Sequence, residues 1–216
     1  MPTITIGGNT YTLITLPASP GFTDVAISMM DAVSVLPSPY VPSQVQTQAW
    51  PGADGWGAQL SLPKMTDIMA GQWRGFLAAL RGAQNVFQLG DPLRPRPCGV
   101  ASGTPVVDGT IGGGNAVTAV TLNTRGWLPS VYRQLLAGDY LQIGYRLYMV
   151  CAEVDADVNG KAQISVYPSL RETPTDGTAI NLINPVGVFR LGANKRQWHT
   201  SVDRLVQTGF TCSEVR

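Results

Sequence analysis

Charged side chains are scarce in this sequence. The chain has 216 residues, of which 15 are basic and 14 acidic, so charged residues make up 13%, about half of the roughly 25% usual in soluble domains. The formal net charge is +1. Intrinsic disorder requires low hydrophobicity and high net charge, whereas 44% of this chain is hydrophobic, so a disordered protein is excluded. Phosphate-driven binding of nucleic acid requires a basic surface, which this balance does not supply.

The few charges are unevenly distributed along the chain. Residues 1–63 contain no Lys or Arg, and their only acidic residues are Asp24, Asp31 and Asp54. The whole chain has twelve Arg but three Lys. Protein interfaces are depleted in Lys, Asp and Glu and enriched in Arg, whereas a free monomer needs mixed surface charge to stay soluble. The composition therefore predicts that other protein covers much of the surface; a β protein with an uncharged polar surface is the alternative.

Cysteine and histidine are also rare. Cys98, Cys151 and Cys212 are odd in number, widely spaced and without a C-x-x-C pair, which predicts reduced thiols rather than a disulfide framework or a metal site. No run approaches the ~20 apolar residues that span a bilayer, and the opening MPTITIGG lacks the basic and apolar regions of a secretory signal. We therefore expect synthesis in a cytoplasm, no membrane insertion, and neither metal nor cofactor.

Motifs of catalysis and metal binding are incomplete. The segment 155–160 matches the first six positions of a calcium loop, but Val166 occupies the place of the bidentate Glu; the favoured interpretation is a hairpin tip in which Asn159-Gly160 forms a type I′ turn. The residues around Ser102 have the wrong spacing for the G-x-S-x-G nucleophile motif. His199, the one histidine, lies in a polar stretch that we interpret as surface. We therefore expect no catalytic residue.

Three other features have both a functional and a structural interpretation. The segment 109–114 is similar to a phosphate loop but lacks the Lys-Ser/Thr that follows one, so a turn is favoured. The pairs Asp155/Asp157 and Glu172/Asp176 have the residue types of a glycosidase couple and are interpreted as solvated loop charges. Tryptophans suit stacking on sugars, but equally suit core and interface positions; they are Trp50, Trp56, Trp73, Trp127 and Trp198.

Short strands and a single helix are predicted from hydrophobic periodicity. A hairpin is expected over residues 1–16 around Gly7-Gly8-Asn9. A helix is expected over about 67–81, with Thr66 as its cap and Gly82 after its end. Its apolar stripe is formed by Met65, Ile68, Met69, Phe76, Leu77 and Leu80. Other strands are expected at 24–30, 44–50, 57–62, 85–89, 117–122, 140–143, 147–154, 162–167, 188–191 and 205–211.

Prolines indicate a domain boundary. Three of the six residues from Pro92 to Pro97 are proline, which is typical of a stiff, extended connector. From residue 98 to about 188, short strands alternate with turn signals such as Gly112–Asn115, a pattern that favours a small barrel or sandwich. The predicted fold class is mainly β with one α-helix (α+β).

A series of packing and turn residues runs through residues 50–190. It comprises Trp56…Leu60-x-Leu62-Pro63-x-Met65, Trp73-x-x-Phe76-Leu77-x-x-Leu80-Arg81-Gly82, Asn85-x-Phe87-x-Leu89-Gly90-Asp91-Pro92, Pro97-x-Gly99-x-Ala101-x-Gly103-x-Pro105-x-Val107, Ala137-Gly138-Asp139-Tyr140-Leu141-Gln142-Ile143, Gly160-x-Ala162 and Pro168-x-Leu170-Arg171. In this arrangement the chain resembles the distal tail proteins, which are tail-tip adaptors of bacteriophages with long, flexible, non-contractile tails. The quoted residues include no catalytic signature.

The resemblance implies a structural role. Distal tail proteins have a hub domain, a β-sandwich with one helix that closes into a hexameric ring, and a second β domain that faces outward. In this chain residues 1–97 would form the hub, with 189–216 returning to it, and 98–188 would form an inserted barrel-like domain, OB-like or a sandwich. The ring would join the tail tube protein to the hub and fibre proteins at the virion's tail tip. Some related tail-tip proteins carry an iron–sulfur cluster, which the three scattered cysteines do not match.

Two arginines on the proline-rich connector, Arg94 and Arg96, are candidate interface anchors, because arginine pairs bidentately and is weakly hydrated. Reversing their charge is expected to weaken assembly. Two other functions stay open. One is a carbohydrate-binding module for host attachment, carried by residues 98–188 and exposed tryptophans. The other is a cell-wall hydrolase, which the shortage of His and of carboxylates in a motif disfavours.

Overall fold

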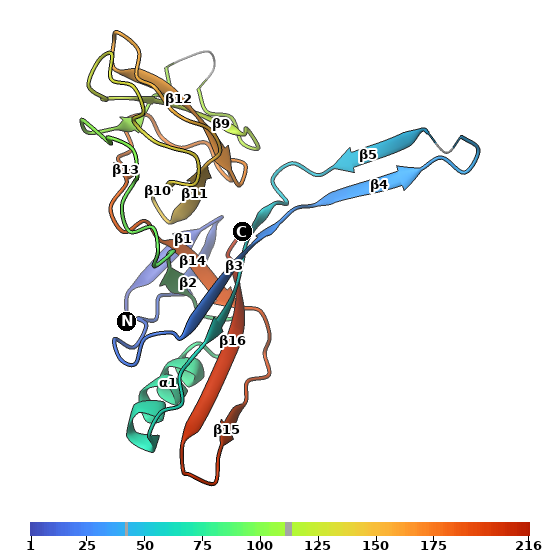
Figure 1. The fold of residues 1–216 in the computed structure, drawn as a ribbon, viewed down its shortest axis with the longest axis vertical. Helices are drawn as coiled ribbons and strands as arrows, with labels where there is room; N and C mark the ends of the chain where they lie inside the picture. The colour runs from blue at the N-terminus through green and yellow to red at the C-terminus, as the bar shows by residue number, and fades with distance from the viewer. Residues whose placement is uncertain (42, 111–113) are drawn as a thin grey trace.

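The computed structural model describes residues 1–41, 43–110 and 114–216. Strands account for 39% of the chain and helix for 6%, which confirms the predicted fold class, mainly β with one helix. Figure 1 shows two sheets stacked along the long axis and a thin two-stranded arm that projects sideways from their junction. We call these parts the barrel sheet, the open sheet and the arm.

The open sheet is antiparallel and combines strands from residues 24–89 with strands from residues 187–214. Its strand order is β3-β6-β16-β14-β7, and β15 pairs with β16 outside this path. The bounds are β3 (Asp24–Met30), β6 (Gly55–Ser61), β7 (Phe87–Leu89), β14 (Gly187–Leu191), β15 (Trp198–Thr200) and β16 (Val206–Glu214). Gly187 and Val188 pair with Leu89 and Gln88 of β7, so the strand that returns to the open sheet begins at Gly187, just before the domain boundary expected at 188.

The barrel sheet is built from the middle of the chain. Its order is β13-β10-β11-β12-β9-β8, and a bridge between Val106 and Ala179 brings its two ends together, so it is nearly barrel-shaped. A separate hydrophobic cluster that includes Leu122, Leu141 and Ile164 fills it. The bounds are β8 (Val106–Val107), β9 (Thr121–Arg125), β10 (Tyr140–Ile143), β11 (Arg146–Val150), β12 (Lys161–Tyr167) and β13 (Ile180–Asn181).

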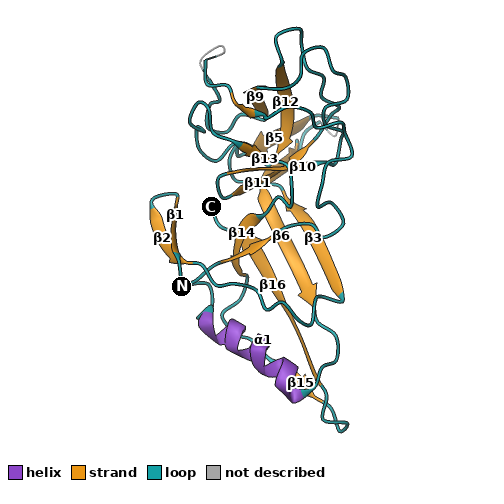
Figure 2. Cartoon of the chain, turned by 90° about the vertical axis from the view of Figure 1, so that its left-hand side faces the viewer, coloured by secondary structure: helices purple, strands orange, loops and turns teal. Residues whose placement is uncertain are grey.

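Helix α1 (Asp67–Ala79) matches the predicted helix to within two residues, and it lies along one face of the open sheet (Figure 2). The predicted stripe is wrong at its start, because Ile68 and Met69 are 85% and 45% exposed. The buried face of the helix runs through Ala70, Trp73, Phe76 and Leu77 instead. Trp73 rather than Ile68 lies on the buried face, because its larger ring packs against Phe22 and Phe76. Its indole N–H also donates a hydrogen bond to the Pro20 carbonyl at 3.2 Å. Thr66 occupies the N-cap position, but its side chain makes no cap hydrogen bond.

The structure has the predicted N-terminal hairpin, but it is shorter than the expected 1–16, because it covers Thr3 to Thr12 and Asn9 already pairs with Ile6. Strands β1 (Thr3–Ile6) and β2 (Asn9–Thr12) pair around Gly7 and Gly8. The inward side chains Ile4 and Ile6 form a small cluster with Val86, Val188 and Val215. The hairpin therefore packs against the chain's own C-terminus as well as against β14.

Three segments do not bear out the sequence predictions: one strand begins at a different residue, and two segments include residues that the structure does not describe. The strand expected at 117–122 is wrong in position: Val117 and Val120 are 49% and 59% exposed, and β9 begins at Thr121, where pairing with β12 starts. The turn expected at Gly112–Asn115 and the loop 109–114 include residues 111–113, which lie outside the described residues.

The junction of the two sheets is aromatic. Trp56 of β6 packs against Tyr140 and Tyr167 of the barrel sheet, with ring centroids 5.9 and 5.0 Å apart. The Trp56 indole N–H donates to the Leu147 carbonyl at 3.0 Å. The two sheets are therefore held in fixed contact beside the root of the arm.

Candidate functional site

The arm is an isolated antiparallel hairpin of β4 (Val33–Pro37) and β5 (Val45–Ala49). The sequence predicted β5 and missed β4. Among the residues that the structure describes, β4 and β5 pair only with each other, and Figure 1 shows them extending away from both larger sheets. A two-stranded hairpin in water is marginally stable at best. The pairing of β4 with β5 therefore gives the arm little stability of its own.

The register of the arm separates two faces. Val33 pairs with Ala49, Val35 with Thr47, and Pro37 with Val45. Because paired residues point to the same side of a sheet and successive residues alternate, these six side chains form one face, which we call the valine face. The opposite face, the glutamine face, is formed by Ser34, Leu36, Gln46 and Gln48.

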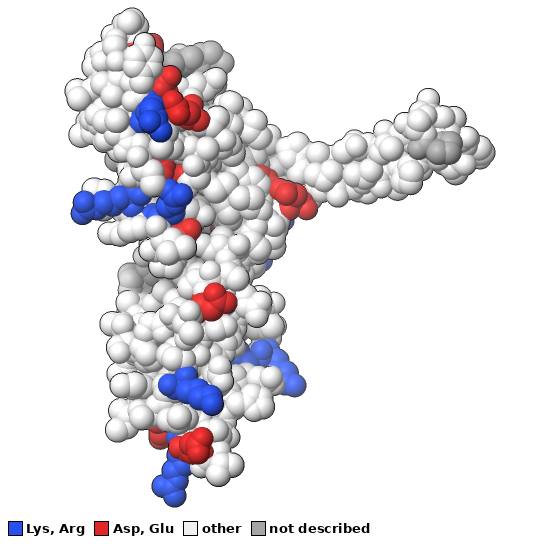
Figure 3. Space-filling view, in the orientation of Figure 1, with Lys and Arg blue, Asp and Glu red and all other residues white. Residues whose placement is uncertain are grey.

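Apolar side chains of the arm are open to solvent. Val33, Val35 and Val45 are 52%, 58% and 55% exposed, and Tyr40 near the tip is 91% exposed. No charged residue occurs between Asp31 and Asp54, and in Figure 3 the arm is uncharged on the face shown beyond its base. Isolated monomers commonly carry charged side chains on exposed strands, which keeps other chains from pairing with them. An uncharged, apolar arm is instead typical of a surface that another protein covers.

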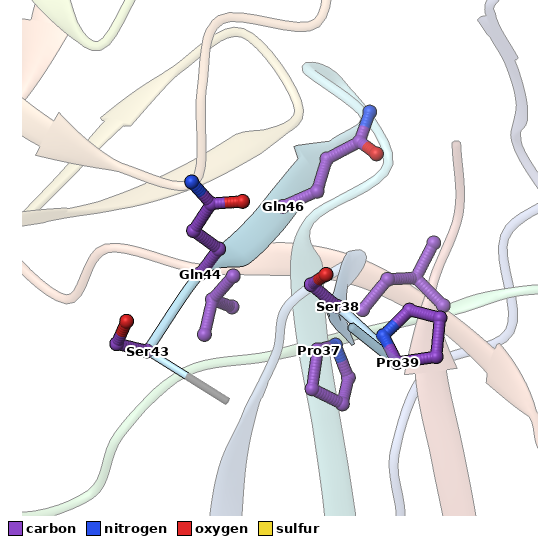
Figure 4. A pocket seen from close by; sticks show the side chains of 8 residues that line it. Pro37, Ser38, Pro39, Ser43, Gln44 and Gln46 are labelled. Atoms are coloured by element: carbon purple, nitrogen blue, oxygen red, sulfur yellow. The ribbon is translucent and has the colours of Figure 1, made fainter. Parts of the chain in front are cut away.

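The tip of the arm has a hollow but no reactive chemistry. Figure 4 shows Pro37, Ser38 and Pro39 on one side of it and Ser43, Gln44 and Gln46 on the other. The Ser38 hydroxyl accepts hydrogen bonds from the backbone N–H groups of Tyr40 and Val41 at 3.3 and 3.2 Å, which organises the turn. The described lining residues include no carboxylate, imidazole, thiol or amine, so this hollow is a shape feature of the arm rather than a catalytic pocket.

The two predicted interface anchors lie on the connector, not on the arm. The Arg94 guanidinium lies 3.8 Å from the Asp139 carboxylate and donates to Cys98 Sγ, so it is partly engaged within the chain. Arg96 is exposed at the rim of an apolar groove that includes Val100 and Ile183. The structure therefore gives the two arginines different surroundings.

The segment 155–160, which is similar to a calcium loop, forms a turn whose Asp155 and Asp157 carboxylates accept hydrogen bonds from backbone N–H groups. Asp155 accepts from the Arg133 N–H at 2.7 Å, and Asp157 accepts from the N–H groups of Asn159 and Lys161 at 2.8 Å each. These backbone bonds, that of Lys161 first, lower the pKa of Asp157. The predicted type I′ turn is wrong: Gly160 has φ +69°, but Asn159 is not left-handed, because Asp157 organises the turn through its side chain.

The candidate residues for catalysis and metal binding lie on different parts of the fold. No group of three His, Cys, Asp or Glu residues there could hold a metal ion. His199 lies exposed on β15, opposite Gln207. The Ser102 hydroxyl is hydrogen-bonded to the Gln134 side chain at 2.9 Å. Cys98 and Cys151 are exposed and Cys212 is buried, all three as free thiols.

The tryptophans divide into buried and exposed groups. Trp56, Trp73 and Trp127 are buried, and the Trp127 indole N–H donates to the Thr124 hydroxyl at 2.8 Å. Trp50, at the base of the arm, and Trp198, which lies 5.8 Å from the Arg74 guanidinium, are about half exposed. Residues 98–188, the segment for which sugar binding was considered, contain Trp127 alone and therefore present no tryptophan at the surface.

The sequence matches no known family model and no curated protein. In the described residues no helix has the length and apolar character needed to cross a membrane.

Proposed function

We propose that this protein is a structural component of a bacteriophage tail tip, which forms a ring that connects the tail tube to the central hub and fibres. In this proposal the arm of each copy lies, valine face inward, on the next copy of the chain. The observation that carries the proposal is the arm itself: an uncharged hairpin whose apolar face has no partner within the described chain.

A ring follows from a head-to-tail contact of this kind. An arm on one side of a subunit and its receiving surface on another side make a heterologous contact, which closes into a ring when the rotation between subunits divides a full turn. Each subunit then covers two sides, and stacking on the tube and hub covers two ends. The shortage of charge in residues 1–63 and the excess of Arg over Lys fit such coverage. The proposed ring has six subunits, as the resemblance to distal tail proteins implies.

The same proposal assigns roles to the parts of the chain. Residues 1–97, together with 189–216, form the ring-building hub, and residues 98–188 form an outward β domain. The role is adaptor rather than enzyme. It needs no cofactor, and its partners are further copies of itself, the tail tube protein and the hub or fibre proteins.

Neighbouring residues of β4 provide a matched test. Val35 and Leu36 are each 58% exposed but point to opposite faces of the arm. We expect V35E to abolish ring formation, because a carboxylate would be buried against the neighbouring copy without a partner, whereas L36E retains it. Light scattering for mass and negative-stain microscopy for symmetry measure both. A wild-type chain that stays monomeric at every concentration, or equal loss of rings in both variants, would contradict the proposal.

A further inference from the structure

The base of the arm is hydrogen-bonded to a segment of the barrel sheet. After β5 the chain runs through residues 50–54 into β6, and this stretch meets residues 167–171, which begin at the last residue of β12. The Gly52 N–H donates to Ser169 Oγ at 3.1 Å, and the Ser169 hydroxyl donates in turn to Asp54 Oδ1 at 2.7 Å. The Ser169 N–H donates to the other oxygen of the same carboxylate at 2.5 Å. A single serine therefore ties two residues of the arm's base together.

Arg171 adds a second set of bonds to the same stretch. Its guanidinium donates to the carbonyl oxygens of Gly52 and Asp54 and lies 3.3 Å from the Glu214 carboxylate of β16. The side chains of Arg171 and Glu214 are 5% and 3% exposed. A Cβ atom at Gly55 would lie 2.7 Å from Arg171 Nη2, so the absence of a side chain at Gly55 leaves room for the guanidinium to approach the backbone. The planar fork of arginine suits this simultaneous contact with several oxygens.

Tyr167 reaches both roots of the arm. Its hydroxyl donates to the Gly55 carbonyl at 3.1 Å, beside the strand that leaves the arm. Burial, followed by the negative charge of the neighbouring Asp31, raises the pKa of Tyr167 to about 12. Gly55 pairs with Met30, which ends β3 just before Asp31 and β4, so this tyrosine lies next to the chain that enters the arm as well.

Bonds at the base matter because the rest of the arm is free. β4 and β5 pair with nothing else in the described chain, so the direction of the arm depends on how its two roots are held. Hydrogen bonds in a buried setting resist rotation of a root more than exposed ones do, because breaking them leaves polar groups unpaired. Asp54 shows this setting: burial acts to raise its pKa, but the Ser169 bonds and Arg171 hold that pKa below its usual value.

We propose that residues 167–171 of the barrel sheet act as a bracket that fixes the direction of the arm, and that Ser169, Arg171 and Asp54 are positioning residues for the contact between copies. The barrel sheet is then more than an outward domain, because its attachment determines where the arm points. This inference rests on the proposed function for its consequence in assembly, but the bracket itself is a property of one chain.

The direct test measures the direction of the arm. Nitroxide labels at Q48C on the arm and V158C on the barrel sheet, in a C98S/C151S background and diluted with unlabelled chain, report their separation by pulsed electron paramagnetic resonance. We expect a narrow distance distribution in the wild-type bracket and at least a doubling of its width in S169A and in R171K. S201A, at an exposed serine in the turn between β15 and β16, is the matched control and is expected to keep the narrow distribution.

Two readouts separate this inference from the proposed function. S169A leaves the Arg171–Glu214 pair in place, so circular dichroism is expected to show an intact fold even if R171K is less stable. Broadened distance distributions in these variants, together with a reduced yield of rings, support both proposals. Broad distances with unchanged ring yield support the bracket and contradict the role of the arm in assembly. Distances that stay narrow in both S169A and R171K overturn the bracket, whatever happens to the rings.

Discussion

The Arg171 guanidinium lies 3.3 Å from the Glu214 carboxylate, and both side chains are almost entirely buried. Arg171 belongs to the segment after β12 of the barrel sheet, whereas Glu214 ends β16 of the open sheet. Burial raises the pKa of Glu214 even though Arg171 and Arg146 act against this shift. The charged pair therefore joins the two sheets at the cost of its own desolvation.

Breaking this pair is predicted to be strongly destabilising. R171M leaves the Glu214 charge buried and unpaired, and we expect it to lower the free energy of unfolding by about 3–5 kcal/mol. The double variant R171M/E214M removes both charges and is expected to regain part of that loss. Urea unfolding at pH 7 measures all three proteins. The exposed pair Arg133–Glu153, with 3.6 Å between charged atoms, is the control: R133M should cost less than about 1 kcal/mol, and an equal cost would contradict the argument from burial.

Asp108 predicts a dependence of stability on pH. It is fully buried in the barrel sheet, and the Thr110 hydroxyl donates to it at 2.5 Å while Lys161 Nζ lies 3.1 Å away. The Thr110 bond, opposed by burial and supported by Lys161, holds the pKa of Asp108 well below its usual range. Because the unfolded chain then takes up a proton at a higher pH than the folded one, this contribution to stability is present above about pH 5 and is lost as the pH falls toward the folded pKa.

Replacing Asp108 tests whether it contributes to the loss of stability as the pH falls. D108N is expected to be less stable than the wild type at pH 7 and to lose less stability between pH 5 and pH 3, because it has no proton to take up at this position. Urea midpoints at pH 7, 5 and 3 measure the slope. D203N, in the exposed turn between β15 and β16, should keep the wild-type slope. Parallel slopes for wild type and D108N would show that Asp108 does not contribute to the acid response.

The thiols are predicted to react in two classes. Cys98 and Cys151 are exposed, whereas burial of Cys212 raises its pKa to about 12. Since the thiolate is the reactive form, we expect two thiols per folded chain to react with a chromogenic disulfide at pH 8 and the third to react only in denaturant. Burial also raises the pKa of Cys151. C151S should reduce the folded count to one, and three fast thiols in the wild type would contradict the burial of β16.

Local signals explain which parts of the fold could be predicted. The bounds of α1 follow from Pro63 before it and Gly82 after it, and the strand at 140–143 lies where it was predicted. The buried face of α1 could not be read from periodicity, because Ile68 and Trp73 are both apolar and only the ring contacts of Trp73 decide between them. Strand β4 was missed because the prolines that follow it obscure the pattern Val33-Ser-Val-Leu.

The bracket at the base of the arm depends on contacts between distant residues. Residues 167–171 and the base of the arm are more than 110 residues apart, and Arg171 and Glu214 are 43 apart. No local pattern marks a side chain that will cross from one sheet to another. The lack of charge in residues 1–63 marks the part of the chain that contains the arm, but it could not indicate that the uncharged residues 32–53 leave the body as a hairpin.

Substitutions at two glycines in α1 are predicted to stabilise the fold rather than destabilise it. Gly71 and Gly75 are exposed, and a Cβ atom added at either would meet nothing within 4 Å. Glycine inside a helix is less favourable than alanine by about 1 kcal/mol, so G71A and G75A are each expected to raise the free energy of unfolding by about that amount. G57A, in β6, is the control, because its added Cβ would lie 2.7 Å from the Ser28 hydroxyl and should destabilise. Thermal unfolding of the monomer measures these changes, and a loss of stability in G71A or G75A would mean that the exposed face of α1 packs more tightly than its surroundings indicate.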